Sequence, residues 1–246
     1  MSAMAVGRVG ERTVAPDSTR SLAGIELLAA LAPAQLQTVE RRCAWRKWQP
    51  GEQIIDRETL GNDVYFVVRG KARVVDYSTS GNREVIFDEL ADGTYFGELA
   101  AIDGEPRSAN IVAVDETVTA SLPADDFISL LFENRDIGLS LMRRLSEMVR
   151  NSTVRIMDLS TLGAHNRIYA ELLRLARTGG GAKPNTAVIH PVPVHSDIAA
   201  RVSTTRETVA RVLSELSHRD LVHREGDSLC IRDLSLLTNM VHKFKE

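Results

Sequence analysis

The stretch Phe96-Gly-Glu-Leu-Ala-Ala-Ile-Asp-Gly-Glu-Pro-Arg-Ser-Ala-Asn-Ile-Val-Ala113 contains the groups that can hold a phosphate and a neighbouring sugar hydroxyl. Gly97 lets the backbone approach an anion closely. Glu98 and Leu99 are predicted to open a short helix, whose free N–H groups and positive dipole end attract a phosphate. Arg107 adds a planar fork of donors for the phosphate oxygens, and Glu98 offers an acceptor for a ribose hydroxyl.

A simpler interpretation of this stretch is an ordinary β-turn with a surface ion pair between Glu98 and Arg107, worth under about 1 kcal/mol. The flanking sequence favours the phosphate site instead. Residues 50–55 and 62–74 are short β-branched runs punctuated by turn residues, with Gly51 and Gly70 at the turns. This pattern is typical of an antiparallel β-roll.

The order Gly-Glu-Leu-Ala, a turn and then Pro-Arg resembles the phosphate-binding cassette of the cyclic-nucleotide-binding domain. The resemblance covers about residues 25 to 150. It implies a β-roll that binds a cyclic nucleotide, cyclic AMP in the first place, with cyclic GMP as an alternative ligand. The cassette residues that it assigns to the ligand are Gly97, Glu98, Leu99, Arg107 and Ser108.

Composition favours two modest domains in a chain of 246 residues with 43% hydrophobic and 26% charged residues. The net charge of −3 is unevenly distributed. Residues 164–246 contain 12 Lys and Arg against 9 Asp and Glu, whereas residues 1–163 contain 18 against 24. An acidic first part and a mildly basic second part suit a sensor joined to a nucleic-acid-binding module.

The cysteines and histidines give no sign of a metal site or a disulfide framework. Cys43 and Cys230 are far apart in sequence, which favours a reducing cytoplasm and argues against an iron–sulfur cluster. The closest histidine pairs are spaced by five residues, which is not the i, i+4 spacing of a helical zinc pair. We therefore expect no metal.

Several other classes of protein are disfavoured. No apolar run approaches membrane-spanning length, and residues 1–21 have no apolar core for a signal peptide, so we expect a flexible tail there and no membrane partner. There is no nucleophile elbow, P-loop or carboxylate pair suited to hydrolysis. An enzyme such as a phosphodiesterase is thus a weak alternative to a binding protein.

Residues 125–162 are predicted to form one long helix, because they contain no proline and only one glycine, Gly138. An apolar seam along it steps by 4, 3, 4 and 3 residues, as in a coiled coil, and predicts a parallel homodimer. The alternative is that this stripe packs on its own β-roll. The seam positions are Leu145, Val149, Ser152, Ile156 and Leu159.

Ser152 is a polar residue in this seam, and it could simply fix the register of the two helices. In the cyclic AMP receptor and FNR family, which the chain resembles, a Thr-Ser pair on this helix bonds the nucleotide base, one member from each subunit. Alignment backwards from the next helix places Ser152 and Thr153 on that pair. Alignment forwards from residues 143–145 places Met148 and Val149 there. We favour the first alignment because only it supplies hydroxyl groups.

Residues 195–216 have the apolar pattern of a helix-turn-helix, although Ser203 occupies the turn position where glycine is usual. Residues 221–232 then predict a β-hairpin that turns at Gly226 and Asp227, which would form a wing. The whole resembles the winged helix-turn-helix of the same family. With both domains in the right order, the resemblance spans nearly the entire chain.

The second helix of this unit is expected to read DNA bases with Arg206, Glu207 and Arg211. Its sequence resembles the family's reader of TGTGA-type half-sites. Glu207 has a simpler role as the second member of a Thr204-x-x-Glu207 capping box, and the arginines could be a solvated helix face. The phosphate contacts are expected from Ser203, Thr204, Thr205 and Thr208.

These observations predict an α+β chain: a flexible tail (1–21), an antiparallel cyclic-nucleotide-binding β-roll (22–124), a dimerisation helix (125–162) and a winged helix-turn-helix (163–246). The expected function is that of a homodimeric, cyclic-AMP-activated transcription regulator of double-stranded DNA. The hinge would lie at residues 160–163, and the loop at residues 179–183 could contact RNA polymerase. The alternatives are a response to cyclic GMP or a cyclic dinucleotide, and ligand-independent DNA binding with a vestigial sensor.

Overall fold

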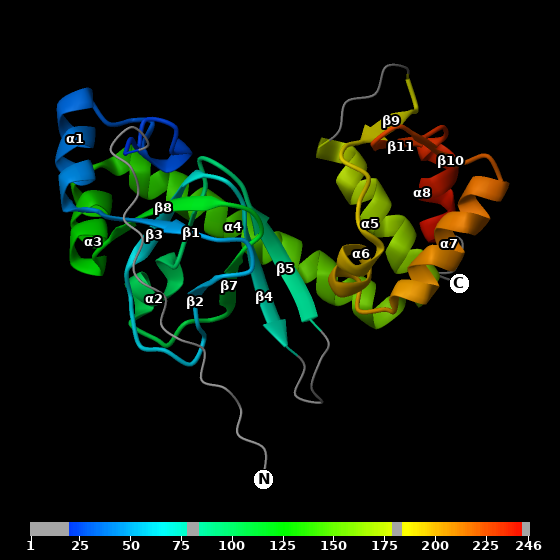
Figure 1. The fold of residues 1–246 in the computed structure, drawn as a ribbon, viewed down its shortest axis with the longest axis horizontal. Coiled ribbons are helices and arrows are strands. Elements are labelled where there is room, and N and C mark those ends of the chain that lie inside the picture. Colours follow the sequence, from blue (N-terminus) through cyan, green and yellow to red (C-terminus); the bar gives the residue numbers. More distant parts are fainter. Residues whose placement is uncertain (1–19, 78–83, 179–183, 243–246) are drawn as a thin grey trace, which may run out of the picture. The chain divides into compact units, whose positions relative to one another are not determined.

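The computed structural model describes residues 20–77, 84–178 and 184–242 (Figure 1). The chain divides into two compact units. The first combines the chain up to Asp76 with Phe87–Arg144, and the second combines Tyr77–Ile86 with Leu145–Glu246. The predicted tail up to residue 19 and the predicted polymerase-contacting loop at residues 179–183 lie outside the described residues.

The first unit contains most of two four-stranded antiparallel sheets, with strand orders β1-β8-β3-β6 and β2-β7-β4-β5; the last residue of β4 and the first three of β5 are counted with the second unit. This arrangement confirms the predicted β-roll. Gly70 joins β3 to β4 at φ +92°, and a Cβ there would lie only 2.5 Å from the Glu116 carbonyl oxygen, so the turn requires glycine. The strands are β1 (Ala44–Trp48), β2 (Gln53–Ile55), β3 (Val64–Arg69), β4 (Ala72–Tyr77), β5 (Glu84–Leu90), β6 (Tyr95–Phe96), β7 (Asn110–Ala113) and β8 (Thr117–Leu122).

The helices of this part of the chain differ from the prediction at one point. The structure has α3 (Ala124–Glu133) and α4 (Arg135–Thr161) where one continuous helix over residues 125–162 was expected. Asn134 separates them in an extended conformation (φ −127°, ψ 95°), and its backbone N–H and side-chain amide both donate to the Leu130 carbonyl. The expectation of one helix was wrong because asparagine competes for backbone hydrogen bonds and ends helices. The other helices here are η2 (Glu26–Leu28), α1 (Pro33–Arg42) and α2 (Glu98–Asp103).

The second unit is a helix-turn-helix followed by a hairpin, which confirms the predicted winged helix-turn-helix. A three-stranded sheet of order β10-β11-β9 accompanies it. The terminal helix α8, red in Figure 1, packs against α5 and was not expected from the sequence. Its elements are α5 (Ala164–Thr178), β9 (Ala187–Ile189), α6 (His195–Arg201), α7 (Arg206–His218), β10 (Val222–Glu225), β11 (Ser228–Ile231) and α8 (Leu234–His242).

The core of this unit explains why α6 and α7 cross at the predicted turn. Ile198 of α6 and Val209, Val212 and Leu216 of α7 are fully or almost fully buried. Ser203 adopts the left-handed conformation (φ +52°) that the turn normally assigns to glycine. The departure noted in the sequence is therefore accommodated without a change in the turn. No helix among the described residues combines the length and the apolarity needed to cross a membrane.

Candidate functional site

Gly97 is the structural centre of the predicted phosphate-binding turn. It follows β6 directly and is the N-cap of α2, with φ +86°. A Cβ at this position would lie 2.7 Å from Arg107 Nη1 and 2.8 Å from the Asp63 carbonyl oxygen. Both the backbone conformation and the lack of space therefore require glycine. The free N–H groups at the start of α2 are thus presented at a fixed position.

Arg107 is held against this turn by backbone carbonyls. Its side chain is buried, with 6% of the residue exposed. Nη1 donates to the Gly97 carbonyl at 3.1 Å and Nη2 donates to the Asp63 carbonyl at 2.9 Å. Burial lowers the pKa of Arg107, an effect that Tyr65 and the neighbouring carboxylates partly offset. A buried guanidinium beside a helix N-terminus is well placed to bind an anion.

Glu98 is also buried, with 4% of the residue exposed. Burial raises the pKa of its carboxyl, while its own backbone N–H and the guanidinium groups of Arg144 and Arg107 act in the opposite direction. Glu98 and Arg107 form no ion pair with each other, and neither is on the surface. The simple surface ion pair considered as an alternative is therefore wrong. Leu99 is half-buried and Ser108 is exposed.

Arg144 is a residue of this site that sequence reasoning missed. It projects from α4, and its Nη2 donates to the Tyr95 carbonyl at 3.1 Å while its guanidinium lies 4.4 Å from the centroid of the Tyr95 ring. Burial raises the pKa of Tyr95 to about 12, so its phenol stays protonated. Arg144 thereby attaches α4 to the residues that lead into Gly97. The only signal in the sequence was a pair of arginines before the apolar seam.

Replacement of Gly97 by alanine is expected to weaken binding of a cyclic nucleotide by about tenfold and to destabilise the fold by about 1–2 kcal/mol. The added methyl group must displace Arg107 or the Asp63 carbonyl, and the left-handed backbone adds strain. Calorimetric titration and thermal unfolding measure the two effects. Gly51→Ala is the matched control, because Gly51 also has a positive φ but a Cβ there meets no atom within 4 Å. Equal losses of nucleotide affinity in both variants would contradict this role of Gly97.

The predicted DNA-reading helix begins one residue later than its expected cap. Thr205, not Thr204, is the N-cap of α7, and its Oγ1 accepts a hydrogen bond from the Thr208 backbone N–H at 3.2 Å. Thr204 is buried, and its backbone N–H donates to the Ala199 carbonyl. The Thr204-x-x-Glu207 capping box was therefore wrong. The backbone N–H of Glu207 and the Thr205 hydroxyl lower the pKa of the Glu207 carboxyl.

The exposed face of α7 presents the three predicted base-reading side chains together. Arg206, Glu207 and Arg211 are all exposed, whereas Val209 and Val212 on the opposite face are fully buried. Neither arginine donates a hydrogen bond to any residue that the structure describes. Both guanidinium groups are thus free to contact DNA. Among the expected phosphate contacts, Thr205 is exposed and Ser203 and Thr208 are half-buried.

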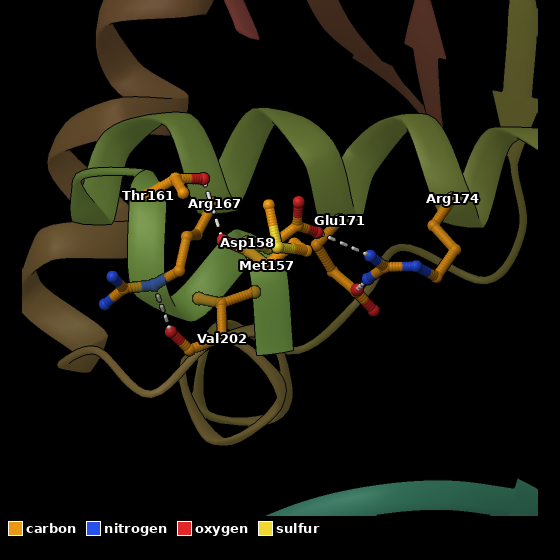
Figure 2. Close-up of polar contacts among 7 residues, drawn as sticks. All are labelled: Met157, Asp158, Thr161, Arg167, Glu171, Arg174 and Val202. Carbon is orange, nitrogen blue, oxygen red and sulfur yellow. Dashed lines mark hydrogen bonds and ion pairs between the residues drawn. The ribbon is translucent and has the colours of Figure 1, made fainter. Parts of the chain in front are cut away.

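Arg167 fixes the turn that precedes this helix, a role that sequence reasoning also missed. Its Nε donates to the Val202 carbonyl at 2.8 Å (Figure 2). Its Nη2 donates to the Ser203 carbonyl at 3.2 Å. Its Nη1 donates to the Leu162 carbonyl at 2.9 Å, between α4 and α5. One guanidinium therefore joins the predicted hinge to the helix-turn-helix turn.

A second group of charges ties the end of α4 to α5 (Figure 2). Glu171 of α5 is buried and pairs with Arg174, whose Nη2 also donates to Asp158 of α4 at 3.1 Å. Arg201 of α6 lies 3.8 Å from the other oxygen of Glu171. Removal of one member of such a buried pair leaves an uncompensated charge, so these contacts restrict how α4, α5 and α6 can move.

Among the described residues, one set of side chains has the composition of a metal site: His223, Glu225 and Cys230 of the hairpin, whose ligand atoms lie within 4.8 Å of one another. Arg232 Nε donates to His223 Nδ1 at 3.1 Å, so the ring proton is on Nε2, which faces Glu225 at 2.7 Å. A metal on Nε2 requires the opposite tautomer and loss of the arginine contact. This geometry suits a hydrogen-bond chain better than a metal ion.

Comparison with known proteins yields two family models that match consecutive parts of the chain. The model described as "Cyclic nucleotide-binding domain" matches residues 45–134, and the model described as "Crp-like helix-turn-helix domain" matches residues 166–240. Together they cover about two thirds of the chain, in the order of the two structural units. The chain belongs to the cyclic AMP receptor and FNR family of transcription regulators. This membership confirms the resemblance and the prediction that the regulator is not an enzyme.

Individual relatives agree with this assignment. The regulator is 29% identical to the cyclic AMP receptor protein of Thermus thermophilus over 214 aligned residues. These residues cover 87% of this chain and 95% of the relative. The regulator is 24% identical over 212 residues to the CRP-like cAMP-activated global transcriptional regulator of Mycobacterium tuberculosis, covering 86% and 94%.

Solved structures show the same fold. A CooA mutant from Carboxydothermus hydrogenoformans superposes with a TM-score of 0.76 at 20% identity, over 88% of this chain and 94% of that chain. The c-di-GMP-responsive global regulator CLP of Xanthomonas campestris superposes with a TM-score of 0.60 at 19% identity, over 78% and 94%.

Proposed function

We propose that this regulator binds cyclic AMP at the turn around Gly97 and, as a homodimer, thereby gains affinity for TGTGA-type palindromes. The observation that carries the proposal is the buried Arg107 guanidinium, held beside the N-terminus of α2 by two backbone carbonyls. In this proposal Arg107, Ser108 and the N–H groups at Glu98 and Leu99 bind the phosphate. The Glu98 carboxylate accepts from the ribose hydroxyl. The predicted domain boundaries belong to the same proposal, with the dimerisation helix restricted to α4 (Arg135–Thr161).

The homodimer is supported by the apolar surface of α4. Val149, Ile156 and Leu159 are 66%, 63% and 49% exposed in the single chain, although they follow a coiled-coil spacing. An apolar stripe of this kind is stabilised when a second helix covers it. We therefore infer that α4 pairs with its copy, which also places two reading helices on one palindromic site.

Two turns of α4 remain candidates for the contact with the nucleotide base. Met148 and Val149 follow Arg144 by about one helical turn, or about 6 Å along the axis, and Ser152 and Thr153 by about two turns, or about 12 Å. Thr153 Oγ1 donates to the Val149 carbonyl at 3.0 Å, which leaves its oxygen able to accept. We keep Ser152 and Thr153 as the proposed pair because hydroxyls can bond a purine edge.

The variants Ser152→Ala and Thr153→Ala are expected to separate nucleotide binding from switching. They should still bind the nucleotide through the phosphate turn. The nucleotide-dependent gain in DNA affinity should be about tenfold smaller, which corresponds to the loss of about one hydrogen bond. Calorimetry and fluorescence anisotropy with labelled DNA measure the two properties. Met148→Ala and Val149→Ala are the matched variants one turn earlier. A loss of switching only in this second pair would favour the other alignment.

The hinge at residues 160–163 is proposed to convey the change to the DNA-binding unit. Thr161 ends α4 and Ala164 begins α5, so Leu162 and Gly163 alone connect the two helices. Arg167 links this connection to the helix-turn-helix turn. A change from about 1% to about 99% active requires roughly 10⁴-fold tighter binding of the ligand to the active state, or about 5.5 kcal/mol.

The ligand and its effect are tested together by titrating the purified protein with cyclic AMP, cyclic GMP and cyclic di-GMP. The last is included because the structural neighbour CLP is described as responsive to it. Labelled TGTGA-type DNA is then titrated with and without each nucleotide. We expect cyclic AMP to bind and to increase DNA affinity. High DNA affinity without any nucleotide would favour the vestigial-sensor alternative. If only another nucleotide binds, that nucleotide and not cyclic AMP is the ligand. We also propose that the regulator acts on DNA in the cytoplasm and contacts RNA polymerase.

A further inference from the structure

A cavity of about 510 Å³ lies entirely within the second unit, where the first turn of α5 meets the end of α7 and α8. It contains none of the residues assigned above to the nucleotide or to DNA. Its volume is in the range of sites for small molecules. Gly163, in the connection between α4 and α5, is part of its wall.

Two buried polar side chains face this cavity without a partner. Asn166 is 6% exposed and Tyr169 is 5% exposed, and both line the cavity. Neither side chain makes a hydrogen bond to any residue in the described part of the chain. Neither side chain has a polar atom that is both fully buried and unpaired, so the amide and the phenol reach the accessible space of the cavity. The amide and the phenol are therefore available to a molecule in the cavity.

The wall of the cavity is rich in donors. The first intrahelical hydrogen bond of α5 runs from Arg167 N–H to the Gly163 carbonyl, so the backbone N–H groups of residues 163–166 precede the helical ladder. Arg219, at the end of α7, also lines the cavity, 3.8 Å from Glu215. Burial and the Glu215 carboxylate raise the pKa of Tyr169, which keeps its phenol a donor. Glu215 is the one carboxylate in this wall.

We propose that this cavity binds a small organic oxyanion, a carboxylate or phosphate ester with an apolar portion. The charged group lies at the N-terminus of the fifteen-residue helix α5, where Asn166, Tyr169 and Arg219 donate to its oxygens. The apolar portion packs on Leu236 and Met240 of α8. Gly163 borders the same cavity, so a bound anion lies beside the α4–α5 connection, at a site separate from the nucleotide turn.

The test uses the full-length protein with ¹³C-labelled methionine methyl groups. The chain has six methionines, and only Met240 lines the cavity, so its NMR signal reports binding there. Its signal is assigned with Met240→Leu. The probes are benzoate and phenyl phosphate, with benzamide as the neutral analogue of the same size. We expect either anion to shift the Met240 signal in a saturable manner, and benzamide to bind about tenfold more weakly because it lacks the charge.

Asn166→Ala and Tyr169→Phe should each weaken binding of the anion by about tenfold, as loss of a hydrogen bond to a charged group predicts. Asn151→Ala, on the exposed surface of α4, is the matched control and should leave it unchanged. Thermal unfolding verifies that each variant is folded. The proposal is overturned if neither anion shifts the Met240 signal up to its solubility limit. Equal binding of benzamide and benzoate, or an unchanged anion affinity in Asn166→Ala, would also overturn it.

Discussion

Arg107→Ala is expected to lower the affinity for cyclic AMP by about 100-fold or more, because hydrogen bonds from a guanidinium to a phosphate contribute about 1.5–3 kcal/mol each. Arg107 is the buried cation beside the start of α2, and both of its Nη atoms are already oriented by backbone carbonyls. Isothermal titration measures the loss. The dimer should remain intact, since Arg107 is not part of the α4 seam; sedimentation verifies this.

Two further variants distinguish a lost phosphate contact from a damaged fold. Arg107→Lys keeps the charge without the planar fork and should lose less affinity than Arg107→Ala. Arg42→Ala is the matched control in the same unit, because Arg42 is exposed and pairs with Asp126 at 2.7 Å, a contact worth at most about 1 kcal/mol. Unchanged cyclic AMP affinity in folded Arg107→Ala protein would show that the phosphate is bound elsewhere.

Arg206→Ala is expected to cost about 1–3 kcal/mol of binding to each TGTGA-type half-site and to relax the preference at one guanine. Arg206 is the first residue of α7, exposed and without a hydrogen bond to the described residues. It can therefore turn both Nη atoms toward a guanine edge. Competition binding against single-base variants of the site, at two salt concentrations, measures the loss at each position.

A contact with phosphate would behave differently. It would weaken binding to specific and random DNA alike and reduce the salt dependence, because counterion release does not depend on sequence. A uniform loss over all variants of the site would thus identify Arg206 as an electrostatic anchor and contradict its reading role. Arg177→Ala, an exposed arginine near the end of α5, is the control for a general loss of positive charge.

The structure also shows where local sequence signals were insufficient. The N-cap of α7 is Thr205 and not the predicted Thr204, because Thr204 lies within the turn, where its backbone N–H donates to the Ala199 carbonyl. Both threonines have the chemistry of a cap, and only the packing of α6 on α7 distinguishes them. The break at Asn134 is similar: asparagine is tolerated within helices, but here its side chain bonds to Leu130 and ends α3.

The sequence by itself determined the features that depend on neighbours within a few residues. The Gly97-Glu98 helix start, the glycine turns of the β-roll and the apolar periodicity of residues 195–216 follow from backbone sterics and helical spacing, and each is present as expected. Arg107 was also recognisable, because a short spacing joins it to Gly97.

Only the tertiary structure decided which distant groups meet. Arg144 and Arg167 donate to the carbonyls of Tyr95, Val202 and Ser203, and these acceptors have no sequence signature because every residue has a carbonyl. The cavity that Asn166 and Tyr169 line depends on the packing of α8 beside α5, which contributes Leu236 and Met240 to its wall. Long-range contacts of this kind depend on how whole elements pack, which local propensity and periodicity do not specify.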